Sequence, residues 1–133
     1  MTDWTFLRAA FAAVAVLIVA ALVGWAVDTA RYEDPGFELL TRCLSQEKGA
    51  PVEETRDPIA RSAELGAVDT VLETNRVTVS VAGDREGAKK IVADYVAVGG
   101  DLGPRLELRG RTVYLWERPP SPTQRQAMFD CTY

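Results

Sequence analysis

Hydrophobic residues follow two different patterns along this chain. Residues 9–27 are apolar without interruption (AAFAAVAVLIVAALVGWAV), whereas the residues after them alternate between apolar and polar positions. A helix over residues 9–27 is about 28 Å long, close to the ~30 Å hydrocarbon core of a bilayer. The pattern therefore predicts a single transmembrane helix over residues 9–27, after a short N-terminal flank of residues 1–8.

Two other interpretations of this apolar segment, a cleaved signal peptide and a buried helix, fit it less well. A cleaved signal peptide has a shorter apolar core, about 7–15 residues, followed by a small-x-small site. Here bulky Trp25 stands between Gly24 and Ala26. A buried helix of a soluble domain would carry a polar stripe, which this segment lacks. Trp4 and Trp25 mark its two ends, as interfacial aromatic residues do. A retained membrane anchor explains the segment best.

After a polar linker over residues 28–33, the pattern predicts one α+β domain over residues 34–133. Four helices are expected, over residues 35–48, 58–65, 84–98 and 122–131. Each has at its start a residue type that caps helices: Asp34, Asp57, Asp84 and Ser121. Ser121 and Gln124 have the spacing of a capping box.

Strand patterns lie between these helices. Residues 76–82 alternate valines with polar residues, as a half-buried strand does. Residues 105–109 and 111–117 predict a hairpin around Gly110. Residues 68–73 fit a strand or an irregular connector, and residues 53–56 fit a charged loop. The order of elements predicts a small, mostly antiparallel sheet with helices packed on one face.

The chain has two cysteines, Cys43 and Cys131, without the spacing of a metal site or of a redox C-x-x-C motif. We expect one disulfide that ties the two ends of the domain together, with the first and last helices side by side. The alternative is two unrelated buried thiols in a cytosolic domain. Because disulfides persist outside the reducing cytosol, the pair favours a cytoplasmic N-terminus and an extracytoplasmic domain. The basic residues that flank the apolar segment do not decide the orientation.

The charge and composition of the chain narrow the range of binding partners that we expect. The net charge of −4 lies entirely in residues 28–133, because Asp3 and Arg8 cancel. A mildly acidic domain is not expected to bind nucleic acid, or to bind anionic lipid through a polybasic segment. The abundance of Ala, Val, Gly and Arg is typical of proteins from bacteria with GC-rich genomes. The layout of one anchor and one outer domain is that of many small bacterial cell envelope proteins.

Chemistry-bearing motifs are scarce. The chain has no histidine, which removes the usual Ser-His and Cys-His nucleophiles and most zinc sites. It also has no phosphate-binding glycine motif and no EF-hand loop. Glu53, Glu54 and Asp57 form the densest acidic cluster, which fits a solvated loop and a helix cap better than a calcium site. Asp84 fits a helix cap in the same way. We therefore expect no cofactor and no metal.

The candidate binding residues are Trp116, Tyr114 and Arg76. Tyr114 and Trp116 lie two apart in a strand and share one face of the sheet. If helices cover only the opposite face, the two rings face solvent, and Arg76 can lie beside them. Exposed aromatic and arginine side chains are typical of protein interfaces. The alternative is that Trp116 packs under the proline-rich segment 119–122 and closes the core.

These patterns favour a membrane-anchored interaction domain or an accessory subunit of an envelope protein complex, without enzymatic activity. Two alternatives stay open. One is a sensor domain that binds a small ligand or peptidoglycan, which requires a pocket with converging polar groups. The other is a hydrolase that uses carboxylates such as Glu53 or Asp84.

Overall fold

The computed structural model describes residues 36–132, and these belong to one compact unit, Pro35–Tyr133. The predicted membrane anchor, its N-terminal flank and the linker over residues 28–33 lie outside the described residues. Within residues 36–132, no helix combines the length and the apolar character needed to cross a membrane.

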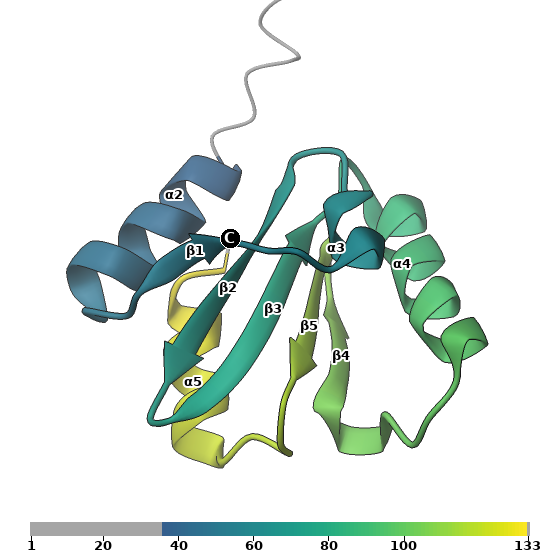
Figure 1. The fold of residues 1–133 in the computed structure, drawn as a ribbon. Coiled ribbons are helices and arrows are strands. Elements are labelled where there is room, and N and C mark those ends of the chain that lie inside the picture. Colours follow the sequence, from purple (N-terminus) through teal and green to yellow (C-terminus); the bar gives the residue numbers. More distant parts are fainter. Residues whose placement is uncertain (1–35, 133) are drawn as a thin grey trace, which may run out of the picture. The chain divides into compact units, whose positions relative to one another are not determined.

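A five-stranded antiparallel sheet organises the domain (Figure 1). Its strands are β1 (Val52–Glu54), β2 (Gly66–Leu72), β3 (Asn75–Val81), β4 (Leu106–Arg109) and β5 (Thr112–Trp116), in the order β1-β2-β3-β5-β4. β2 with β3 and β4 with β5 form hairpins, and a helix carries the chain from β3 past β5 to β4. The predicted α+β class is therefore confirmed.

The helical elements are α2 (Gly36–Arg42) with a π-helical turn η1 (Cys43–Glu47), α3 (Pro58–Arg61), α4 (Arg85–Val98), the 3₁₀ turn η2 (Gly103–Arg105) and α5 (Pro122–Asp130). Three helices, α3, α4 and α5, begin where the sequence predicts caps. Asp57 accepts a hydrogen bond from the backbone of α3, and Asp84 from that of α4. Ser121 and Gln124 form the predicted capping box at the start of α5.

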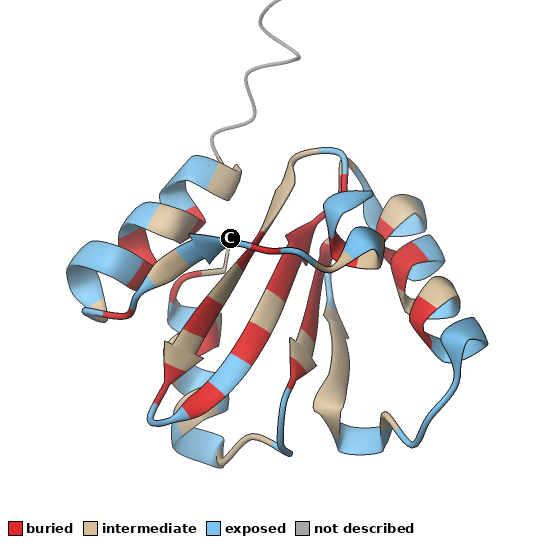
Figure 2. Cartoon of the chain, in the orientation of Figure 1, coloured by how far each residue is buried: buried red, intermediate tan, exposed pale blue. Residues whose placement is uncertain are grey.

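Helices cover both faces of the sheet, so the prediction that they cover one face is wrong (Figures 1 and 2). Leu40, Leu44 and Met128, from α2, η1 and α5, pack against the valines of β3. On the other face, the core includes Ile91 of α4 and Val113 of β5. The physical reason lies in β5, where Val113–Trp116 presents large apolar side chains to both faces, and each face must be covered.

The segment between α2 and β2 also differs from the sequence prediction. The expected charged loop contains strand β1, which pairs Val52 with Thr70 and Glu54 with Val68. Two adjacent glutamates hide this strand, because both are exposed and no apolar alternation is left. α3 ends at Arg61, before the predicted end at residue 65. The ambiguous segment 68–73 belongs largely to strand β2.

The predicted disulfide is present. Cys43 in η1 is bonded to Cys131 at the end of α5, with a Cα–Cα distance of 5.4 Å across a sequence separation of 88. Both cysteines are buried. Beside the bond, Lys48 Nζ lies 2.9 Å from Asp130 Oδ2. The first and last helices of the described domain are thus joined side by side, as expected.

Candidate functional site

Tyr114 and Trp116 lie in the core rather than on the surface. Both side chains are 0 % exposed, and they face the same side as Val79 and Val77, which lie opposite them on β3. The Tyr114 hydroxyl shares a hydrogen bond with Thr132. The prediction that these rings face solvent is wrong, because α5 and α2 cover this face of the sheet. Whether either residue affects binding stays a prediction.

Burial changes the chemistry of the two rings. Desolvation raises the pKa of Tyr114 to about 12, against the weaker opposing effect of its hydrogen bond to Thr132. The indole Nε1 of Trp116 is buried without a hydrogen-bond partner among the described residues. These properties fit side chains that fill the core, which agrees with the alternative that Trp116 closes it.

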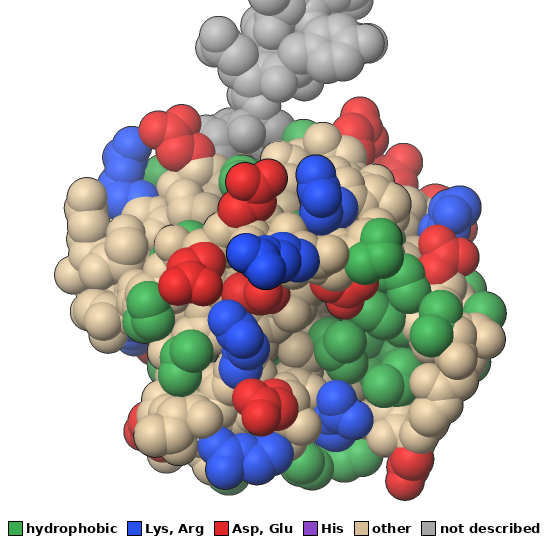
Figure 3. All heavy atoms as spheres, viewed as in Figure 1, with side chains coloured by type: hydrophobic (Ala, Val, Ile, Leu, Met, Phe, Trp, Pro, Cys, Tyr) green, Lys and Arg blue, Asp and Glu red, His purple; other side chains and the backbone are tan. Residues whose placement is uncertain are grey.

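Arg76 does stand on an open part of the sheet. Its guanidinium lies 3.6 Å from the Glu53 carboxylate, and both side chains are more than half exposed. Nearby, Thr78 donates a 2.7 Å hydrogen bond to Asp69. Figure 3 shows acidic and basic side chains mixed over this region, with hydrophobic side chains gathered nearer to α4. The exposed sheet surface over β1, β2 and β3 is therefore polar rather than aromatic.

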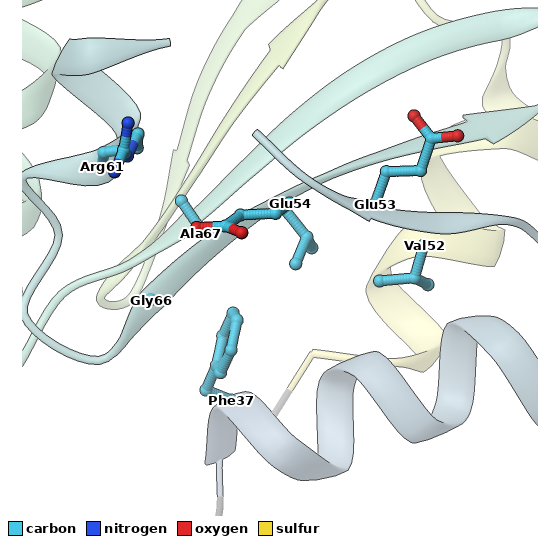
Figure 4. Close-up of a pocket in the computed structure, with 8 residues that line it drawn as sticks. Phe37, Val52, Glu53, Glu54, Arg61, Gly66 and Ala67 are labelled. Carbon is cyan, nitrogen blue, oxygen red and sulfur yellow. The ribbon is translucent and has the colours of Figure 1, made fainter. Parts of the chain in front are cut away.

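A groove with a volume of about 530 Å³ lies beside strand β1. It lies between α2, α3 and the paired strands β1 and β2 (Figure 4). Its lining residues come from four elements: Phe37, Val52, Glu53, Glu54, Arg61, Gly66, Ala67 and Val68. We call this hollow the β1 groove.

The β1 groove combines an apolar surface with one free charge of each sign. Phe37, Val52 and Val68 supply the apolar part. Glu54 from β1 and Arg61 from α3 line the same groove, and neither side chain makes a hydrogen bond or an ion pair among the described residues. Such a surface can bind an apolar group and a charged group together.

Gly66 shapes the wall of the groove. Its φ of +143° is unfavourable for other residues, and a Cβ added there would lie 2.7 Å from the Phe37 ring. Phe37 and Gly66 lie far apart in the sequence, in elements whose packing no local pattern reveals. The sequence therefore carries no local signal for this groove, although Glu53 and Glu54 stand out in it as part of an acidic cluster.

The acidic cluster predicted from the sequence is divided among separate roles. Glu53 pairs with Arg76, and Glu54 lines the β1 groove. Asp57 caps α3 and accepts a 2.6 Å hydrogen bond from the Tyr95 hydroxyl. The pKa of the Tyr95 phenol is raised well above its usual value, mainly by burial and to a smaller extent by this hydrogen bond. Within residues 36–132, no group of three or more Asp, Glu, Cys or His side chains is arranged to hold a metal ion.

Comparison with known proteins found no matching family model, curated protein or solved structure. An α+β fold by itself does not identify a function. The function must therefore be inferred from the side chains that the domain presents.

Proposed function

We propose that this chain is a single-pass protein of the bacterial cell envelope whose domain, outside the cytoplasm, binds another envelope protein as an interaction module or accessory subunit. The observation that carries this proposal is the β1 groove, with its apolar wall and the unpaired charges of Glu54 and Arg61. The role is one of recognition rather than catalysis.

The lining of the groove defines the partner by its chemistry. Phe37 and Val52 offer apolar surface to a hydrophobic side chain. Glu54 complements a basic group, and Arg61 complements a carboxylate, in each case without breaking an existing ion pair. A protein segment that carries an apolar residue beside residues of opposite charge satisfies all three contacts. Aromatic and arginine side chains are also enriched at protein interfaces.

The disulfide supports the proposed location. Cys43 and Cys131 are bonded inside the folded domain, and such bonds persist in oxidising compartments outside the cytosol. With the apolar segment 9–27 as an anchor, this favours a cytoplasmic N-terminus and an extracytoplasmic domain.

A sensor domain for a small ligand or for peptidoglycan is the second candidate. The volume of the β1 groove, about 530 Å³, falls in the usual range of ligand sites, roughly 300–1,000 Å³. The hydrolase alternative has less support, because Glu53 is paired with Arg76 and Asp84 caps α4.

Binding through the groove is tested by photo-cross-linking in intact cells. A photoreactive residue replaces Ala67 in the groove or, as a control, Lys89 on α4. We expect a defined protein adduct from position 67 and none from position 89. The adduct should disappear when Glu54→Lys and Arg61→Glu are introduced, and persist with the matched exposed-pair variants Glu86→Lys and Lys89→Glu. The protein-binding proposal is wrong if no adduct forms, or if the groove variants leave it unchanged; binding of a peptidoglycan fragment instead would favour the sensor.

The proposed location has a separate test. Cysteines are labelled with a thiol reagent in intact cells and in denatured lysate, with and without a reductant. Labelling that requires both denaturation and reduction means that the disulfide exists in the cell and supports the extracytoplasmic placement. Labelling after denaturation alone means free thiols and would remove the main support for that placement.

A further inference from the structure

Strand β4 forms the outer edge of the sheet, opposite the edge formed by β1. Only β5 pairs with it among the described strands. A hollow of about 420 Å³ runs beside it, lined by Pro104, Glu107, Leu108, Pro120 and Arg125. An open strand edge is a surface on which another strand can add.

The hairpin turn fixes which backbone groups of β4 point outward. β4 and β5 are joined by the two residues Gly110 and Arg111, and Arg109 pairs with Thr112. In a two-residue hairpin the flanking pair exchanges hydrogen bonds, and the next residue points its backbone groups the other way. The N–H and C=O groups of Leu108 therefore face the open edge, whereas the N–H of Leu106 on the same side already donates to the Gly103 carbonyl of η2.

The charges of β4 are complementary to a second copy of itself. Glu107 and Arg109 lie on the same sheet face. In an antiparallel pairing centred on Leu108, the two Leu108 residues exchange two hydrogen bonds. Glu107 of each copy then stands opposite Arg109 of the other, an opposite-charge pair of the kind that stabilises antiparallel strands. A register centred on Glu107 would instead place two glutamates opposite each other.

The environment of Arg109 fits such a pairing. Its guanidinium carbon lies 4.1 Å from the centre of the Phe129 ring, and the residue is exposed, with no ion pair among the described residues. Glu107 is held by Arg125 at 2.8 Å, and its side chain is 18 % exposed. The Arg109 guanidinium is thus stacked on a ring but makes no ion pair among the described residues. The Glu107 carboxylate, on the same face, is already held in position by Arg125.

From this pattern we propose that two copies of the chain associate edge to edge through β4, in the antiparallel register centred on Leu108. The two sheets join into one of ten strands. This inference goes beyond the proposed function and does not depend on it. Because the β1 groove lies at the opposite edge of each sheet, the dimer leaves both grooves open.

The test uses the full chain in detergent micelles and measures its mass by sedimentation equilibrium. We expect the wild-type chain to be dimeric. Glu107→Arg places arginines opposite each other, and Arg109→Glu places glutamates opposite each other, so each variant alone should be monomeric. Mixed together, the two variants restore both opposite-charge pairs and should form a heterodimer. The double variant E107R/R109E should dimerise with itself.

Charge reversal of the exposed pair Glu86 and Lys89 on α4 serves as the control and should leave the dimer unchanged. Circular dichroism checks that each variant folds, and recovery in the mixture excludes misfolding as the cause of lost association. A monomeric wild-type chain, a single variant that stays dimeric, or a mixture without heterodimer would each overturn the proposed register.

Discussion

The Tyr95 hydroxyl donates a 2.6 Å hydrogen bond to one carboxylate oxygen of Asp57, while the other oxygen accepts a 2.9 Å bond from the backbone N–H of Ile59. The Asp57 carboxylate therefore caps the N-terminus of α3 and also accepts a hydrogen bond from a side chain of α4. Because both helices cover the same face of the sheet, the hydrogen bond between Tyr95 and Asp57 fixes the position of α3 relative to α4 over that part of the core.

Replacing Tyr95 with Phe tests this link. The change removes the hydroxyl and leaves the Asp57 carboxylate with one partner fewer, so we expect the free energy of unfolding to fall by about 1–2 kcal/mol. Urea denaturation measures the loss. Asp57→Ala should cost more, since it also removes the helix cap, whereas Asp57→Asn keeps a good capping residue. Equal stability of Y95F and wild type would show that the bond contributes nothing.

Alkaline pH should destabilise the domain through the buried side chains of Tyr95 and Tyr114. Burial raises the pKa of Tyr114 to about 12 and also raises the pKa of Tyr95 above its usual value, whereas an unfolded tyrosine titrates near pH 10. The stability due to these raised values is complete below about pH 10 and is lost as the pH rises through the folded values. Stability measured by urea denaturation from pH 8 to 12 should fall above pH 10, and less steeply in a Tyr95→Phe variant. A parallel decline in both proteins would contradict this assignment.

The disulfide should supply a large part of the stability. Closing a loop with a sequence separation of 88 residues lowers the entropy of the unfolded chain by an amount worth about 4–5 kcal/mol. We expect Cys43→Ala/Cys131→Ala to unfold at a much lower denaturant concentration than the oxidised protein. Wild type measured in a reductant should approach the variant. Similar midpoints for all three would mean that the bond adds little.

Gly66→Ala should destabilise the domain by packing as well as by backbone strain. The new Cβ would lie 2.7 Å from the Phe37 ring, at a φ of +143°. Gly100→Ala is a matched control, because Gly100 also has a positive φ, +102°, but nothing lies within 4 Å of the added Cβ. Thermal unfolding should rank G66A below G100A. Adding Phe37→Ala to G66A should recover part of the difference in unfolding temperature between G66A and G100A. If it recovers none, the destabilisation of G66A is due to backbone strain at the positive φ alone.

Trp116→Ala should remove about 3–5 kcal/mol, the usual cost of deleting a large buried aromatic ring. Trp116→Phe should cost clearly less, because it keeps most of the ring and removes an indole N–H that has no partner among the described residues. Guanidinium denaturation measures both. A stable W116A variant would show that the ring does not belong to the core.

Local signals in the sequence predicted much of this fold. Asp57, Asp84 and Ser121 cap helices where expected, because capping depends on neighbouring residues alone. The pairing of Cys43 with Cys131 was predicted from their places near the two ends of the domain and is confirmed. These features need no knowledge of distant packing.

The errors arose where distant segments decide the outcome. The burial of Tyr114 and Trp116 depends on α5 and α2 covering their face. A signal for it was present, since four consecutive large apolar residues in β5 require cover on both sides. The β1 groove left no such signal, because Phe37, Arg61 and Gly66 meet only in the folded domain.

The covalent link between Cys43 and Cys131 also decides how the domain bears tension. A pull applied between the two ends of the described domain can extend only the seven residues of α2 before it reaches Cys43. It then crosses the sulfur bridge directly to Cys131. The five strands lie inside the bypassed loop and carry no load, so such a pull leaves the sheet and both of its edges intact. Only a reductant would let the force enter β1 and peel the sheet apart.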